Sequence, residues 1–108
     1  MSRDNLGEFE QLVLLAILRL GSEAYGLAVL AEIERQTKQA ASIGSLYVTL
    51  DRLEDKGLIR SRLAKATDAR GGRPRRYVTA TPRAINLLRA SRRALLNLWD
   101  GLETVFDG

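Results

Sequence analysis

Basic side chains are concentrated in one short stretch of the chain. Between Ile59 and Arg76 there are seven Lys and Arg residues and a single acidic one, which gives this segment a charge of +6 and leaves −2 for the remainder. Guanidinium groups bind phosphate through paired hydrogen bonds, so the segment predicts contact with a polyanion. Four of these cations flank a predicted loop that contains two glycines: Arg70, Arg73, Arg75 and Arg76.

Other kinds of chemistry have little support in the 108 residues. The chain contains neither His nor Cys, which removes disulfides, most structural zinc sites and nearly all serine or cysteine hydrolase arrangements. No Gly-Lys-Ser/Thr follows the Gly71-Gly72 pair, so a phosphate-binding loop for nucleotides gains no support. The acidic residues are scattered along predicted helix surfaces. We therefore expect no enzyme, no catalytic residue, no metal and no cofactor.

A second candidate binding surface lies on a predicted helix that begins after Ser42 and runs from residue 43 to about 56. Leu46, Leu50 and Leu53 form its buried row. The opposite face starts with small or hydrogen-bonding residues, which a helix in a DNA major groove requires in its first turns. The predicted DNA contacts of this helix are Ser42, Gly44, Ser45, Val48 and Arg52. Asp51 and Asp55 count against this interpretation, and an ordinary amphipathic surface helix is equally compatible with the pattern.

The elements around these residues predict a winged helix-turn-helix. Helical periodicity covers residues 6–20, 25–38 and 43–56, and Gly57 ends the third helix. β-prone segments at 58–63 and 76–80 flank the basic loop as a hairpin with a long tip, the wing. Thr81-Pro82 then opens a last helix that extends to about residue 105. The predicted fold is mainly α with a small β-hairpin: residues 1–81 bind DNA and residues 82–108 form a dimerisation helix, in one compact unit.

Apolar residues on the first and last helices predict a homodimer. The first helix is apolar nearly all round, and the last is longer than a domain of this size can cover. Pairing with a second copy would cover both and relate two recognition helices by a two-fold axis. The alternative is a monomer whose last helix folds back over the first. The predicted interface residues are Leu14, Leu15, Leu18, Leu88, Leu95, Leu98, Trp99 and Leu102.

Four segments of the chain resemble the PadR family of transcriptional regulators: LGEFEQLVLLAIL, AYGLAVLAEIE, SIGSLYVTLDRLEDKGLI and GGRPRRYVTATP. The short length is similar to the compact branch of the family, with a single C-terminal helix. The resemblance implies a dimeric repressor in which Tyr25 contacts the DNA backbone and Tyr47 belongs to the recognition helix. It further implies a role for Arg75, Arg76 and Tyr77 in the return strand of the wing. Val48 and Asp51 depart from the family pattern, so operator preference cannot be transferred.

The expected partners follow from these patterns and this resemblance. They are double-stranded DNA with a palindromic operator, a second copy of the chain and, as family members commonly show, a small aromatic or lipophilic effector. Trp99 offers a stacking surface for such a molecule, although a core role in the interface explains it as well. The sequence shows no signal peptide and no membrane span, so we expect a cytoplasmic protein. A winged helix used for protein–protein assembly is the main alternative, and an RNA-binding module is a weaker one.

Overall fold

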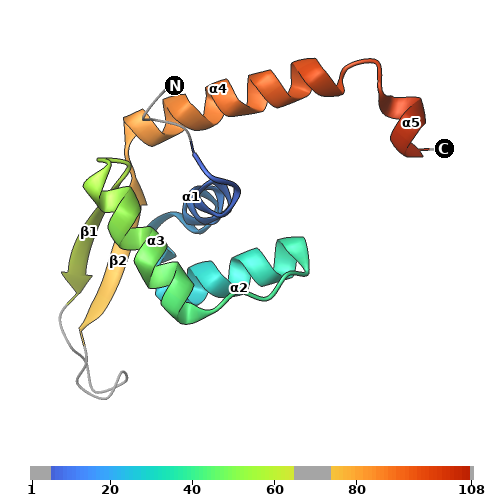
Figure 1. The fold of residues 1–108 in the computed structure, drawn as a ribbon. Helices are drawn as coiled ribbons and strands as arrows, with labels where there is room; N and C mark the ends of the chain where they lie inside the picture. Colours follow the sequence, from blue (N-terminus) through green and yellow to red (C-terminus); the bar gives the residue numbers. More distant parts are fainter. Residues whose placement is uncertain (1–5, 65–73, 108) are drawn as a thin grey trace.

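The computed structural model describes residues 6–64 and 74–107. Helices and strands follow one another in the predicted order, with an additional short helix at the end (Figure 1). Mainly helical structure with one antiparallel hairpin confirms the predicted fold class. The elements are α1 (Glu8–Leu20), η1 (Gly21–Glu23), α2 (Gly26–Thr37), α3 (Ile43–Asp55), β1 (Ile59–Ala64), β2 (Arg75–Ala80), α4 (Pro82–Trp99) and α5 (Glu103–Asp107).

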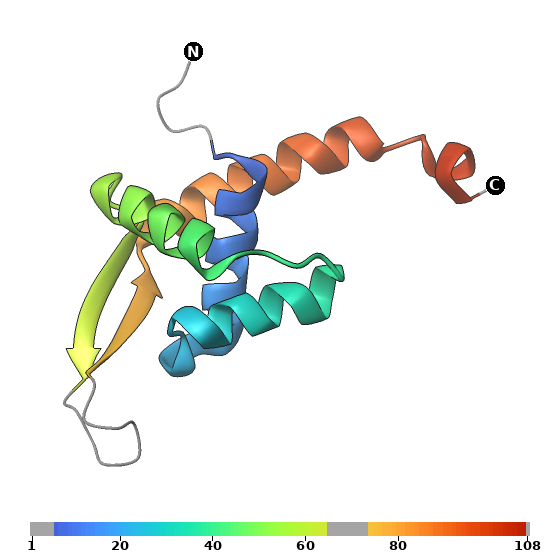
Figure 2. The same ribbon diagram turned by 60° about the horizontal axis from the view of Figure 1, so that its bottom comes forward.

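Helix α1 lies at the centre of the fold and is contacted by α2, α3 and β2 (Figure 2). Because neighbours surround it on several sides, Leu14 is fully buried within its own chain, together with Val13 and Ile17. The prediction that Leu14 contacts a second chain is therefore wrong. Leu15 and Leu18 of α1 remain exposed. None of the described helices combines the length and the apolar character that crossing a membrane requires.

The predicted helix boundaries rest on residues that satisfy the free backbone groups at helix ends. Ser42 accepts a hydrogen bond from the backbone N–H of Ser45 at 3.0 Å and so caps α3. Gly57 follows α3 with φ of +75°, a conformation that favours glycine. Thr81 caps α4 by accepting from the N–H of Ala84, and Pro82 occupies the first turn. These local signals place α3 directly before the hairpin and α4 directly after it.

The hairpin pairs β1 with β2 in an antiparallel register that runs from Ile59 opposite Ala80 to Ala64 opposite Arg75. A further backbone contact extends the sheet beyond β2, because Val78 N–H donates to the carbonyl of Ala24 at 2.9 Å. This contact brings Tyr25, the residue before α2, beside Tyr77. The predicted tip of the wing, including Arg70 and Arg73, lies outside the described residues.

The last helix differs from the prediction of one helix to about residue 105. Helix α4 ends at Trp99, and Gly101 with φ of +85° reverses the chain before α5. Only the first half of α4 packs on the core, through Ala84 and Leu88, and Ser91 donates to the side chain of Gln11 at 3.0 Å. Leu88 is only 8% exposed, so it presents almost no surface to a partner, contrary to its place in the predicted interface. The second half of α4 extends away as an arm that carries α5 at its far end (Figures 1 and 2).

Candidate nucleic-acid interface

Helix α3 presents the face that the sequence predicts for base contact. Leu46, Leu50 and Leu53 are completely buried, which fixes the rotation of the helix about its axis. The residues on the opposite side are all exposed: Ser42, Gly44, Ser45, Val48, Asp51, Arg52 and Asp55. No side chain of the described residues comes within 4 Å of a Cβ built on Gly44, so the first turn of α3 can approach another surface closely. This face has the size and the polar groups that a major groove admits.

The start of α2 approaches α3 most closely at Gly26. A Cβ atom built on Gly26 would lie 2.7 Å from the hydroxyl oxygen of Tyr47. Because such a distance is well below van der Waals contact, only glycine permits Tyr47 to lie where it does. Tyr47 is therefore packed along the start of α2 while its side chain stays partly exposed. The contact of its ring with Gly26 fixes the position of α3 relative to α2.

Two arginines stack on two tyrosines on the face of the hairpin that lies away from the core. The guanidinium carbon of Arg75 lies 3.9 Å from the ring centroid of Tyr25, and that of Arg62 lies 4.7 Å from the ring centroid of Tyr77. The two rings meet edge to face at 5.7 Å. A hydrogen bond to the Tyr77 hydroxyl raises the pKa of Arg75. We call these four residues the Arg–Tyr cluster.

Arg76 lies on the other face of the hairpin, where acidic side chains of α3 bind its guanidinium group. Its guanidinium donates to Asp51 at 3.1 Å, to Glu54 at 2.8 Å and to the hydroxyl of Ser61 at 3.0 Å. Hydrogen bonds from Ser61 and Arg76 lower the pKa of Glu54. Arg76 therefore differs from its predicted role, because two carboxylates already neutralise the charge that was assigned to phosphate. It instead joins the hairpin to the recognition helix.

One of these ion pairs accounts for Asp51, one of the two acidic residues that opposed a DNA-binding interpretation. Asp51 pairs with Arg76 at 3.1 Å. Lys56 pairs with Glu10 on α1 at 2.8 Å and not with Asp55. Burial alone would raise the pKa of Glu10, but hydrogen bonds from Lys56 and from the Gly7 N–H lower it below its usual value. These pairs link α3 to the hairpin on one side and to α1 on the other.

Sequence reasoning did not find the contribution of Arg62 to this surface. The alternation of β1 put Arg62 on one strand face, but only the register with Tyr77 shows that the two side chains meet. Tyr25, which the family resemblance had selected, lies at the same place. Among the described residues, no group of three or more acidic side chains is arranged to hold a metal ion. The described surface therefore carries positively charged side chains, hydroxyl groups and, on α3, a helix face made of small residues.

The sequence of the chain matches a model of the transcriptional regulator PadR-like family over residues 14–88, which is well over half of its length. The chain belongs to the PadR-like family. The matched region of this PadR-like protein includes α2, α3, both strands and the start of α4. The family consists of transcriptional regulators and not of enzymes. None of the curated proteins matches the chain in sequence.

Solved structures of PadR-like regulators have the same fold. A PadR family transcriptional regulator from Eggerthella lenta is 28% identical, with a TM-score of 0.67 over 91% of this chain and 85% of that one. A PadR-like transcriptional regulator from Bacillus cereus is 22% identical, with a TM-score of 0.69 over 93% and 92% of the two chains. A PadR-like transcription factor from Bacteroides fragilis gives 21% identity and a TM-score of 0.70, covering 90% and 88%. The likeness extends beyond the family match into the C-terminal arm.

Proposed function

We propose that this PadR-like regulator is a homodimeric repressor that binds a palindromic DNA operator. Each copy places α3 in a major groove and lays its hairpin along the neighbouring backbone. Residues 1–81 contact DNA, and residues 82–108 hold the two copies together. The observation that carries the proposal is the exposed face of α3, where Gly44, Ser45 and Val48 leave room for base edges beside Arg52.

The charged residues around α3 fall into two groups: some are free to bind phosphate, and others hold the hairpin in position against α3. Arg62 and Arg75 stack on tyrosine rings, so their guanidinium groups are oriented and yet keep free donors for phosphate oxygens. Arg76 fixes the angle between hairpin and α3 through Asp51 and Glu54. Tyr25 and Ser42 lie at the starts of α2 and α3, where backbone N–H groups favour an anion. Arg70 and Arg73 are proposed to extend the phosphate contacts at the wing.

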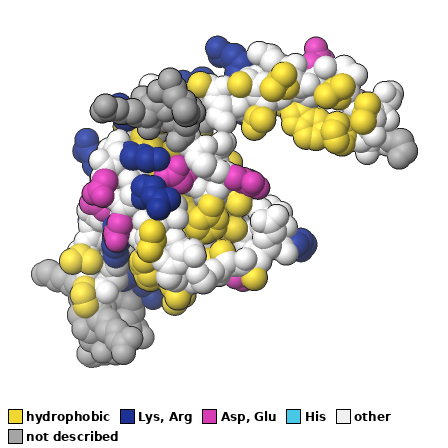
Figure 3. All heavy atoms as spheres, viewed as in Figure 1, with side chains coloured by type: hydrophobic (Ala, Val, Ile, Leu, Met, Phe, Trp, Pro, Cys, Tyr) yellow, Lys and Arg dark blue, Asp and Glu magenta, His cyan; other side chains and the backbone are white. Residues whose placement is uncertain are grey.

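Exposed apolar residues support the homodimer. Leu15 and Leu18 on α1 and a row on the arm are open to solvent in the single chain. Figure 3 shows hydrophobic side chains gathered along the side of α4 that faces the body, and others on the body over α1. A surface of this kind marks an interface in soluble proteins. The arm residues that remain in the proposed interface are Leu95, Leu98, Trp99 and Leu102.

Selection of bound sequences from a random duplex pool tests this function. We expect a palindrome whose half-sites lie about 34–36 Å apart, one turn of DNA. Ser45→Ala and Arg52→Ala are expected to change the selected sequence, because both residues lie on the exposed face of α3. Arg93→Ala is the matched control, since Arg93 is exposed on α4, outside the residues proposed to contact DNA. Recovery of no motif would contradict the proposal and favour a protein-assembly role.

Release from DNA by a small aromatic or lipophilic molecule forms the last part of the proposal. A groove of about 500 Å³ between α1 and α4 is lined mainly by apolar residues, including Leu15, Leu95 and Trp99. This volume is within the usual range for small-molecule sites. Trp99 is the only tryptophan of the chain, so its fluorescence reports binding directly. Quenching by an aromatic probe that also lowers DNA affinity would support the proposal, whereas binding without any effect on DNA affinity would contradict it.

A further inference from the structure

A hollow lies beside the exposed face of α3, between α3 and the first turn of α1. Figure 2 shows the start of α1 alongside α3, and the two helices are in contact. The hollow has a volume of about 560 Å³, which is within the usual range for small-molecule sites. We call it the α1–α3 hollow, and its walls include Glu8, Phe9 and Glu10 from α1 and Val48, Thr49 and Arg52 from α3.

Thr49 brings to this hollow a hydroxyl group that has no hydrogen-bond partner. The residue is only 5% exposed, and its side chain forms no hydrogen bond with any residue of the ranges 6–64 and 74–107. Within these ranges, every side-chain nitrogen or oxygen atom that is closed off from solvent has a partner. The Thr49 hydroxyl is therefore open to the hollow that it lines. Because a largely buried hydroxyl without a partner is costly, a ligand with a polar group at this place is stabilised.

Two opposite charges line the α1–α3 hollow, one from each helix. They are the carboxylate of Glu8 and the guanidinium of Arg52, and both residues are exposed. Neither forms an ion pair within the described part of the chain. Glu10 differs from them, because Lys56 and the Gly7 N–H already bind its two oxygens, each at 2.8 Å. The hollow therefore keeps one negative and one positive group for a ligand.

Apolar side chains complete the wall of the hollow. Phe9 of α1 and Val48 of α3 both line it. Val48 is 57% exposed, so a ligand that covers it removes apolar surface from water.

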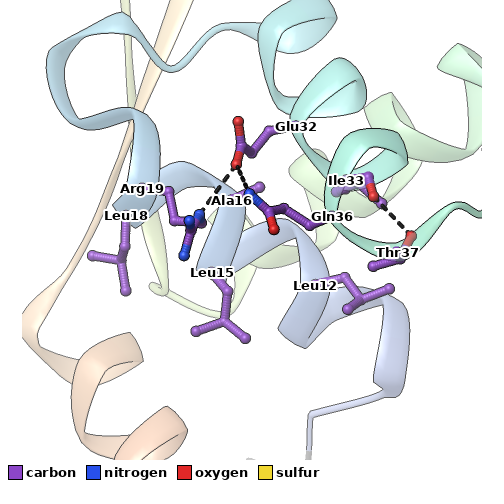
Figure 4. A pocket seen from close by; sticks show the side chains of 9 residues that line it. All are labelled: Leu12, Leu15, Ala16, Leu18, Arg19, Glu32, Ile33, Gln36 and Thr37. Carbon is purple, nitrogen blue, oxygen red and sulfur yellow. Dashed lines mark hydrogen bonds and ion pairs between the residues drawn. The ribbon is translucent and has the colours of Figure 1, made fainter.

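The groove between α1 and α2 has a different character (Figure 4). Its carboxylate, Glu32, already accepts hydrogen bonds from Arg19 at 3.1 Å and from Gln36 at 3.0 Å. Its walls include Leu15 and Leu18, which belong to the proposed homodimer interface. Of these two sites, the α1–α3 hollow is the one that offers a ligand unpaired groups of both signs.

We propose that the α1–α3 hollow binds a free amino acid with an apolar side chain. The carboxylate of the ligand pairs with Arg52, and its ammonium group pairs with Glu8 on the opposite wall. Thr49 lies one turn before Arg52 on α3, so its hydroxyl donates to the same carboxylate. The side chain of the ligand covers Val48 beside Phe9.

This ligand occupies surface that the proposed function assigns to DNA. Ser45, Val48 and Arg52 line the hollow and are also proposed base contacts. The inference therefore rests on the proposed function: amino acid and operator compete for α3, and the amino acid releases the protein without acting on the dimer. The site is separate from the groove between α1 and α4, whose lining includes Trp99.

Titration calorimetry of the free protein tests the site without DNA. The probe is L-leucine, and isocaproate and isopentylamine are its analogues without the amino group and without the carboxylate. We expect L-leucine to bind and each analogue to bind at least tenfold more weakly, because each lacks one of the two charges. Trp99 fluorescence should stay constant, since Trp99 does not line the hollow. Absence of binding by L-leucine, L-valine, L-methionine and L-phenylalanine at millimolar concentrations would overturn the proposal, as would equal binding of either analogue.

Two variants change the hollow and leave the proposed DNA contacts in place. Thr49→Val keeps the shape of the side chain and removes its hydroxyl, whereas Glu8→Gln removes the negative charge. Each should weaken L-leucine binding severalfold, while DNA affinity in the absence of L-leucine does not fall. The matched control for Glu8→Gln is Glu34→Gln, because Glu34 is exposed on α2 outside the hollow. An equal loss of L-leucine binding in the control would overturn the assignment of the site.

DNA binding at rising L-leucine concentration separates this inference from the proposed function. For simple competition, L-leucine at about nine times its Kd should weaken binding to the selected palindrome about tenfold. L-leucine that binds the protein without lowering DNA affinity would overturn the competition at α3 and leave the proposed function intact. A protein that binds L-leucine but no DNA would overturn the proposed function, and the amino-acid site would stand on the calorimetry alone.

Discussion

Arg75 and Arg76 are adjacent on β2, yet the structure assigns them opposite roles, and DNA binding at varied salt distinguishes them. Arg75 stacks on Tyr25 and donates a hydrogen bond to the Tyr77 hydroxyl, whereas Arg76 is held by Asp51 and Glu54. Arg75→Gln should therefore remove a phosphate contact. The matched variant changes Arg76→Gln and Asp51→Asn together, which removes one positive and one negative charge and leaves the net charge unaltered.

The expected difference follows from counterion release. Each phosphate contact contributes about 0.9 to the slope of log affinity against log salt. Arg75→Gln removes one contact in each subunit, so the slope of the dimer should fall by about 1.8. Over a fourfold increase in salt, the unmodified protein should then lose about 12-fold more affinity than the variant. The double variant at Arg76 and Asp51 should keep the original slope.

Fluorescence anisotropy with a labelled duplex, titrated at four or more NaCl concentrations, measures these slopes. Arg93→Gln on α4 controls for the loss of one positive charge away from the proposed interface. A slope that falls as much for the double variant as for Arg75→Gln would refute the reasoning, because Arg76 would then exchange its carboxylates for phosphate. An unchanged slope for Arg75→Gln would show that the Arg–Tyr cluster does not touch DNA.

Three further predictions concern the stability of the scaffold, and urea unfolding followed by circular dichroism measures each of them. Leu50→Ala should lower the free energy of unfolding by about 2–5 kcal/mol, because Leu50 is fully buried. Leu63→Ala, at an exposed position in β1, should change it by less than about 0.5 kcal/mol, and equal losses would contradict the assignment of the core. Ser42→Ala removes the cap of α3 and should cost about 1 kcal/mol, with Ser42→Gly costing less. The pKa of Glu10 is lowered in the folded state, so the stability from its pair with Lys56 should be present above pH 4.5 and lost as pH falls below it. Glu10→Gln should flatten this pH dependence, and an identical profile for both proteins would exclude Glu10 as its source.

Local signals made most of the fold predictable from the sequence. Ser42, Gly57 and Thr81-Pro82 each act on backbone groups within a few residues, so their effect can be read without knowing the fold. The exposed face of α3 was predictable for the same reason, because its buried leucines repeat at helical spacing. The end of α4 was predicted too late, since the apolar row continues past Trp99. Gly101 was the signal that marked the break.

Contacts between distant residues were not predictable. Arg76 meets Asp51 and Glu54, which lie 25 and 22 positions earlier, only because the hairpin folds back over α3. The burial of Leu14 likewise depends on how many elements surround α1, which periodicity along one helix does not reveal. The pairing of Arg62 with Tyr77 requires the strand register. In each case the sequence supplied the residue and its type, and the tertiary structure decided its partner.

The arm that leaves the body beyond Ser91 has a consequence for how the protein responds to its own abundance. The eight residues from Arg92 to Trp99 are all exposed in the single chain. So short a helical extension, with its side chains exposed, is only marginally stable in water. Assembly is therefore expected to complete the folding of the arm, and helical content should fall on dilution as subunits separate. In the proposed homodimer, a newly made chain would therefore acquire its full structure only when enough copies are present to find one another.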